Sequence, residues 1–107
     1  MSSCKQPLVT VITSTLNDAS ALPDTIESIR NSDYPAIEYI IVDGDSKDGT
    51  VDVIQRSPDV VTSYLSEPDS GIYDAWNKAL AIASGEYIAF LGAGDRYVDN
   101  GLRRLMD

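Results

Sequence analysis

Residues 37–50 read IEYIIVDGDSKDGT, an apolar run that passes directly into a loop rich in Asp, Gly and Ser. Apolar residues follow one another without interruption from Tyr39 to Val42, which is typical of a strand in a parallel sheet covered on both faces. Ligands of open α/β sheets bind outside the carboxyl ends of the strands. The stretch therefore predicts a buried strand whose following loop borders a ligand site.

Outward from this strand, apolar strands and amphipathic helices alternate along the chain. Strands are expected at residues 8–13, 37–42, 60–65 and 87–91. Helices are expected around residues 22–29, at 49–56 and 72–83, and near the end, where Val98, Leu102, Leu105 and Met106 have helical spacing. The order predicts an α/β fold: a mostly parallel sheet with helices on both faces. With 107 residues, the chain has room for one domain, which we place at 8–107 after a short tail at 1–7.

Composition excludes several classes of function. Eight Lys and Arg against seventeen Asp and Glu give a net charge of −9, which disfavours binding to nucleic acid or to anionic lipid. The absence of His excludes imidazole bases and His-ligated metals. A single cysteine, Cys4, permits no intrachain disulfide, and no apolar run reaches the about 18 residues of a membrane span. We expect a cytoplasmic protein, and docking of a longer form on the inner face of the membrane remains open.

Carboxylates follow several of the predicted strands. Asp18 comes after the first strand, Asp43, Asp45 and Asp48 follow the second, and Asp95 follows the fourth. Because parallel strands end at one edge of a sheet, we expect these side chains to gather there around Mg²⁺ or Mn²⁺. The alternative is that they serve turns and helix caps, an interpretation strongest for Asp48, which precedes Gly and Thr at a helix start.

The helix predicted at 72–83 carries a polar face. Asp74 and Lys78 are four residues apart, so they form either an intrahelical ion pair or a site in which Lys78 reaches a diphosphate. Tyr73 and Trp76 are interpreted as core residues in preference to a stacking platform. Gly85 lies where glycine commonly ends a helix.

Four blocks of the chain carry a resemblance to a known family: VTVITSTLN at 9–17, IEYIIVDGDSKDGT at 37–50, EPDSGIYDAWNKA at 67–79 and ASGEYIAFLGAGD at 83–95. In order and spacing they resemble the N-terminal half of inverting family-two glycosyltransferases of the GT-A fold, of the bacterial polysaccharide-synthesis type. The resemblance implies transfer of a sugar from a nucleotide-diphospho sugar to a saccharide or lipid-linked acceptor hydroxyl. It also implies a divalent cation.

The resemblance implies a donor-binding set and one metal ligand. The set consists of Thr13, Thr15 and Asn17 in the nucleotide pocket, Asp43 and Asp45 beside the base and ribose, and Asp74 and Lys78 near the ribose and diphosphate. Asp95 matches the last carboxylate of the family's Asp-x-Asp-type motif, which holds the metal.

The sequence departs from the family pattern at three places. Gly44 stands where a second Asp often contacts the base, Leu16 stands where an aromatic residue often stacks on it, and Gly92-Ala93-Gly94-Asp95 retains one carboxylate of the metal motif. A UDP-type donor is still expected over a GDP-type donor. The metal is expected to need the donor phosphates to complete its coordination.

The general base that deprotonates the acceptor is expected beyond Asp107, so the chain itself is predicted to bind donor and to turn over little sugar. Its open sheet edge is expected to permit self-association. Two alternatives are kept: a receiver-like signalling domain, which shares the length, the acidity and Asp residues at strand ends, and a non-catalytic association module.

Overall fold

The computed structural model describes residues 7–32, 34–68 and 72–92. Along the chain the elements are β1 (Val9–Thr15), α1 (Leu22–Arg30), β2 (Ile37–Asp43), α2 (Thr50–Gln55), β3 (Ser63–Ser66), α3 (Ile72–Ile82) and β4 (Tyr87–Phe90). The predicted alternation of strand and helix is confirmed throughout this part of the chain.

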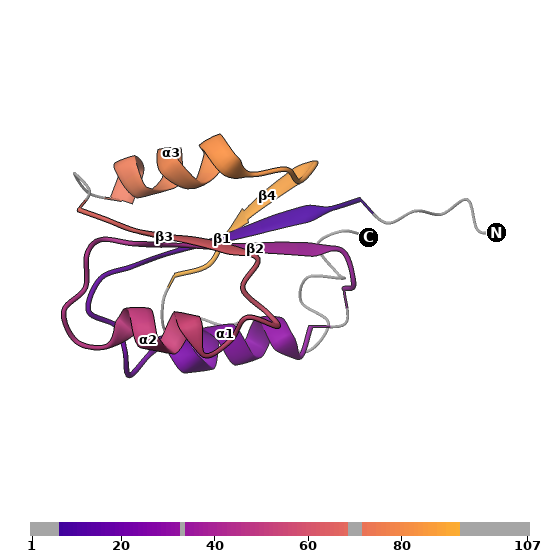
Figure 1. The fold of residues 1–107 in the computed structure, drawn as a ribbon. Helices are drawn as coiled ribbons and strands as arrows, with labels where there is room; N and C mark the ends of the chain where they lie inside the picture. Colours follow the sequence, from indigo (N-terminus) through magenta and orange to yellow (C-terminus); the bar gives the residue numbers. More distant parts are fainter. Residues whose placement is uncertain (1–6, 33, 69–71, 93–107) are drawn as a thin grey trace.

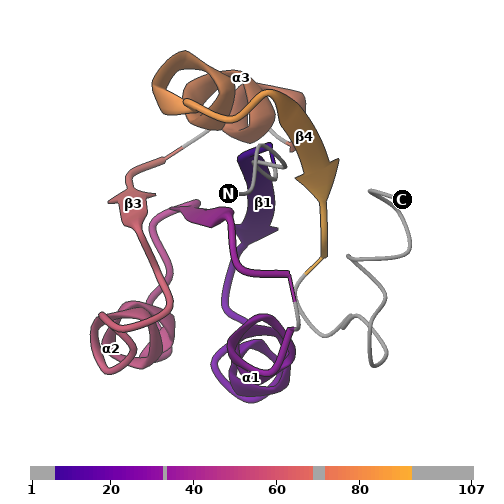
Figure 2. The same ribbon diagram turned by 90° about the vertical axis from the view of Figure 1, so that its right-hand side faces the viewer.

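The strands form one four-stranded sheet in the order β3-β2-β1-β4, with every neighbouring pair parallel. Helices α1 and α2 lie on one face and α3 lies on the other (Figures 1 and 2). The predicted parallel sheet with helices on both faces is therefore confirmed. From β1, the following strands β2 and β3 lie on one side and β4 lies on the other, so the order in which strands are added to the sheet switches direction at β1. In open α/β sheets, ligands bind at the carboxyl ends of the strands beside such a switch.

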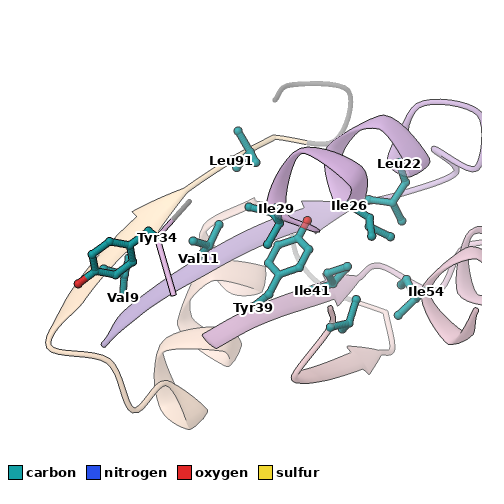
Figure 3. Close-up of a cluster of buried hydrophobic side chains, with 11 residues drawn as sticks. Val9, Val11, Leu22, Ile26, Ile29, Tyr34, Tyr39, Ile41, Ile54 and Leu91 are labelled. Atoms are coloured by element: carbon teal, nitrogen blue, oxygen red, sulfur yellow. The ribbon is translucent and has the colours of Figure 1, made fainter. Parts of the chain in front are cut away.

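The larger core cluster lies between the sheet and the helices α1 and α2 (Figure 3). Its largest fully buried side chains come from both layers and include Leu22, Ile26, Tyr39, Ile41 and Ile54. A smaller cluster on the other face joins the sheet to α3. The central strands β1 and β2 are thus packed on both faces, which makes them a firm support for the loops that follow them.

The third strand differs from its predicted range of 60–65, because Val60 and Val61 lie in a turn. The backbone amides of Val60 and Val61 both donate to Ser57 O, at 3.1 and 3.0 Å. The strand begins at Ser63 and runs to Ser66. Val60 and Val61 favour a strand by residue type, but their hydrogen bonds in the turn after α2 keep them out of β3. The first strand extends to Thr15, two residues past its predicted end, and the helix predicted around residues 98–106 lies outside the described residues.

Two side chains of the central strands hold the start of β4. Thr10 Oγ1 donates to Glu38 Oε1 at 2.7 Å and accepts from Gly85 N at 2.9 Å, and Ser84 N donates to the same Glu38 oxygen at 2.8 Å. Gly85 was expected to end the preceding helix, but α3 ends at Ile82, and Gly85 instead lies directly against β1. The connection from α3 is therefore bound to the sheet before β4 begins.

No helix within the described ranges combines the length and apolar composition needed to cross a bilayer.

Candidate functional site

The loops after β1 and β2 interlock at the carboxyl edge of the sheet. Asn17 N donates to Ser46 Oγ at 2.7 Å, and Lys47 N donates to Asn17 Oδ1 at 2.9 Å. Asn17 and Asp45 both have left-handed backbones, with φ of 53° and 70°. Such backbones cost free energy in residues other than glycine, so the contacts between the loops must hold them. The predicted residue Asn17 therefore lies at the junction of the two loops.

The carboxylate of Asp43 is fully buried at the end of β2. Oδ2 accepts from Ser46 N at 2.8 Å and from Ser66 Oγ at 2.9 Å, and Oδ1 accepts from Ser46 Oγ. All these donors are neutral, and they come from the loop after β2 and from the end of β3. The predicted proximity of Asp43 to the loop edge is seen, but its side chain is enclosed by protein.

The hydroxyls of Thr13 and Thr15, two residues predicted for the nucleotide pocket, are engaged by other side chains of the protein. Thr13 is fully buried and its hydroxyl pairs with the Tyr39 hydroxyl at 2.8 Å, while Thr15 Oγ1 donates to Asp18 Oδ2 at 3.0 Å. Alternate residues of a strand face opposite sides, and this alternation turns Thr13 toward the core beneath α1. The Thr13 hydroxyl is therefore engaged in the core, and the place of Thr13 in the nucleotide pocket stays a prediction.

Asp18 organises the loop after β1, in agreement with the turn-and-cap alternative for the carboxylates at strand ends. Its Oδ2 also accepts from Leu16 N at 3.1 Å, and its own amide donates to Thr50 Oγ1 at 3.0 Å. Asp is one of the residues that favour turns, so this signal was available in the sequence. Asp45 is half-exposed and pairs with Lys47 Nζ at 3.1 Å.

Asp48 serves the start of α2, as its cap interpretation predicted. Its Oδ1 accepts from Thr50 N at 3.1 Å and its Oδ2 from Ala19 N at 3.2 Å. The hydrogen bond from the Thr50 hydroxyl is the main cause that lowers the pKa of Asp48, and the two backbone amides add to it. Asp48 thus joins the first loop to α2 in its ionised form.

We predict that Asp48→Asn lowers the melting temperature near neutral pH and that this difference shrinks in acid. A carboxyl whose pKa is lowered by folding contributes stability above its ordinary pKa of about 3.9 and loses it as the pH falls through the folded value. Thermal unfolding at about pH 7 and about pH 3 measures both differences. Asp52→Asn, on the exposed first turn of the same helix, is the control. An equal pH dependence in the two variants would contradict the prediction.

Lys78 is held by three oxygen atoms. Its Nζ lies 2.9 Å from Pro68 O, 3.1 Å from Glu67 Oε1 and 3.4 Å from Asp74 Oδ2. Partial desolvation lowers the pKa of Lys78, but the hydrogen bonds with Glu67 and Asp74 outweigh it, so the pKa is raised. The ion-pair interpretation of Asp74 and Lys78 is confirmed, and this pairing holds Lys78 against the segment after β3.

The side chain of Trp76 packs against Phe90, with ring centroids 4.5 Å apart and an interplanar angle of 36°. Trp76 is half-buried beside the smaller core cluster, as its core interpretation predicted. The side chain of Tyr73 lies outside those that the structure describes.

The predicted metal ligand Asp95 lies outside the described residues. Within the described ranges, no three His, Cys, Asp or Glu side chains are placed to hold a metal ion. Asp43 is enclosed by neutral donors, and Asp48 accepts from the first amide of α2. The predicted gathering of carboxylates around a cation stays a prediction, since it includes Asp95.

The fold places the protein among the GT-A glycosyltransferases. The chain is similar to the mannosyltransferase PcManGT of Pyrobaculum calidifontis, solved with GDP-Man and Mn²⁺, with a TM-score of 0.83 and 31% identity over 90% of this chain and 30% of that one. It also shares the fold of S. aureus TarS, with a TM-score of 0.83 and 24% identity over 92% of this chain and 18% of that one.

Residues 10–107 match the model of glycosyl transferase family 2, and the chain belongs to this family. It is 40% identical over 92 residues to the uncharacterized glycosyltransferase Rv1514c of Mycobacterium tuberculosis, covering 85% of this chain and 35% of the relative. It is 38% identical over 106 residues to the putative teichuronic acid biosynthesis glycosyltransferase TuaG of Bacillus subtilis, covering 95% of this chain and 42% of the relative. The chain thus spans well under half the length of these curated relatives.

Proposed function

We propose that this chain is the donor-binding part of an inverting glycosyltransferase that transfers a sugar from a nucleotide-diphospho sugar to an acceptor hydroxyl. The observation that carries the proposal is the pair of interlocked loops after β1 and β2, held at the carboxyl edge beside the reversal of strand order. The 31% identity to a mannosyltransferase solved with GDP-Man supports this edge as the donor side.

Within this proposal, the described residues bind and orient the donor. Asp45 is half-exposed on the loop after β2 and has acceptor oxygens for base or ribose donors. Asn17 supplies the backbone geometry of the neighbouring loop. Lys78 is neutralised by Glu67 and Asp74, so a direct contact with the diphosphate would require it to exchange these partners.

A divalent cation is part of the proposal, with Asp95 as its ligand from this chain. The support is the Mn²⁺ in the mannosyltransferase structure and the position of Asp95 after the strand β4. When bound, such a cation neutralises charge on the leaving nucleoside diphosphate. The protein's own contribution is to hold the donor so that its anomeric carbon faces an acceptor.

The donor base and the acceptor are proposed only by class. A UDP-type donor remains the preference from the sequence, and the mannosyltransferase with GDP-Man makes a GDP-type donor the specific alternative. A saccharide or lipid-linked acceptor is supported by the similarity to TuaG, a putative teichuronic acid biosynthesis enzyme. Family membership argues against the receiver-like alternative.

Titration calorimetry with UDP and with GDP tests the donor-binding proposal. We expect one of these nucleotides to bind with an affinity that rises when Mn²⁺ is added. Asp95→Ala is expected to weaken the Mn²⁺-dependent binding by about tenfold or more, because it removes a charged metal ligand. Glu86→Ala removes the same charge from the exposed residue directly before β4 and should leave the affinity unchanged. Failure of both nucleotides to bind, with and without Mn²⁺, would refute the proposal and favour a non-catalytic association module.

A further inference from the structure

One buried side chain joins the end of β2 to two other segments. Asp43 has no exposed surface, and its carboxylate accepts from Ser46 N, Ser46 Oγ and Ser66 Oγ. Its carbonyl oxygen also accepts from Glu67 N at 3.0 Å. A buried carboxylate is tolerated only when such donors replace the water that it has lost. The donors here thus fix the end of β3 against the end of β2.

Ser46 extends this connection to the loop after β1. Its hydroxyl donates to Asp43 Oδ1 and accepts from Asn17 N at 2.7 Å. Because a hydroxyl has one hydrogen, its donation to Asp43 leaves the oxygen lone pairs for the Asn17 amide. A continuous series of hydrogen bonds therefore runs from Ser66 through Asp43 and Ser46 to Asn17.

We propose that Asp43 is a positioning residue, assisted by Ser66, and that it does not contact the nucleotide. Together these two residues hold Ser46, and through it the left-handed backbone of Asn17, in the geometry that receives the donor. The inference rests on the proposed function for the identity of the ligand. It departs from the role beside the base and ribose that the family resemblance implied for Asp43.

Burial and strain support the positioning role. For Asp43 to reach a ligand, the loop would have to open and break hydrogen bonds to a charged group, which are among the stronger ones in proteins. Asn17 has a φ of 53°, a backbone conformation that persists only where its surroundings impose it. The Ser46 hydroxyl, which accepts from Asn17 N, helps to impose it, and Asp43 orients that hydroxyl.

Ser66 allows the proposal to be tested with little risk to the fold, because it is an exposed residue at the end of β3. Ser66→Ala removes one donor to Asp43, while Ser66→Thr keeps a hydroxyl there. Ser63→Ala makes the same truncation at the other end of this strand and is the matched control. Each variant is titrated with UDP and GDP in Mn²⁺. Hydrogen exchange of the Ser46 and Asn17 backbone amides with solvent is followed by NMR without nucleotide.

For Ser66→Ala we expect nucleotide binding about fivefold weaker and exchange of both amides about tenfold faster, the scale of losing one hydrogen bond to a charged group. Ser66→Thr and Ser63→Ala should match the parent protein in both measurements. Unchanged amide hydrogen exchange in Ser66→Ala would overturn the proposal. If nucleotide binding is weaker while the exchange is unchanged, Ser66 contacts the ligand directly instead. Faster exchange with unchanged affinity would also overturn it.

The two proposals fail separately in this design. If the parent protein binds neither nucleotide, the proposed function falls. The amide exchange, which needs no ligand, then decides by itself whether Asp43 and Ser66 hold the loop of Asn17.

Discussion

Replacing Gly85 with alanine is expected to destabilise the protein by about 2–3 kcal/mol, in the upper part of the usual range for forcing a group into a packed site. A Cβ at this position would meet Thr10 Oγ1 and would lie 2.6 Å from Thr10 N and 3.0 Å from Leu8 O. Two of these atoms belong to the backbone of β1 and the residue before it. Since β1 pairs with β2 on one side and β4 on the other, it cannot move away without loss of ladder hydrogen bonds.

Chemical denaturation monitored by circular dichroism measures this loss. Ser84→Ala, one residue earlier and exposed, keeps the backbone amide that donates to Glu38 and should change stability little. A Gly85→Ala variant as stable as the Ser84→Ala control would show that the connection from α3 can shift away from β1. The close approach seen in the structure would then not be required for folding.

Truncation of Ile41 to alanine is expected to have the largest effect on stability, about 3–4 kcal/mol. Ile41 has no exposed surface and lies in the middle of β2, facing the core cluster under α1 and α2 (Figure 3). Strands β1 and β3 flank Ile41 in the sheet and the core cluster covers its side chain, so the space left by the lost atoms cannot close easily. Urea unfolding gives the change in the free energy of unfolding.

Ile37→Ala provides the matched comparison for that measurement. Ile37 begins the same strand and packs against the same cluster, but it is only half-buried. The same atoms are removed, so the difference between the variants reports burial alone, and Ile37→Ala should cost about half as much. Equal losses at the two positions would contradict the packing described here for the centre of β2.

These stability effects bear directly on the donor-binding edge. The loops that hold Asn17, Asp45 and Asp48 follow β1 and β2, whose positions depend on the core under Ile41. The turn at Gly85 fixes β4, the strand that leads toward Asp95. Variants at Ile41 and Gly85 therefore need their nucleotide affinity measured well below their unfolding midpoints, so that loss of fold is separated from loss of the site.

The amino-acid sequence by itself determined the order of the elements and their class. Continuous apolar runs such as residues 39–42, separated by amphipathic segments, require a parallel sheet covered on both faces. It also placed Asp48 at a helix start and offered an Asp74–Lys78 ion pair as one of two alternatives, because caps and i,i+4 pairs are local interactions. These features depend on residues within a few positions of one another, and the structure confirms them.

Only the tertiary structure decided which polar side chains face solvent at the site. The family resemblance placed Thr13 and Asp43 beside the nucleotide, yet in the structure Tyr39, Ser46 and Ser66 occupy their hydrogen-bonding groups. Gly85 looked like a helix stop, but in the structure its lack of a side chain lets it lie directly against β1. Each of these partners comes from a neighbouring strand or from a loop folded back on it. The order of the strands in the sheet, which depends on packing of the whole chain, therefore sets the roles that local patterns could not.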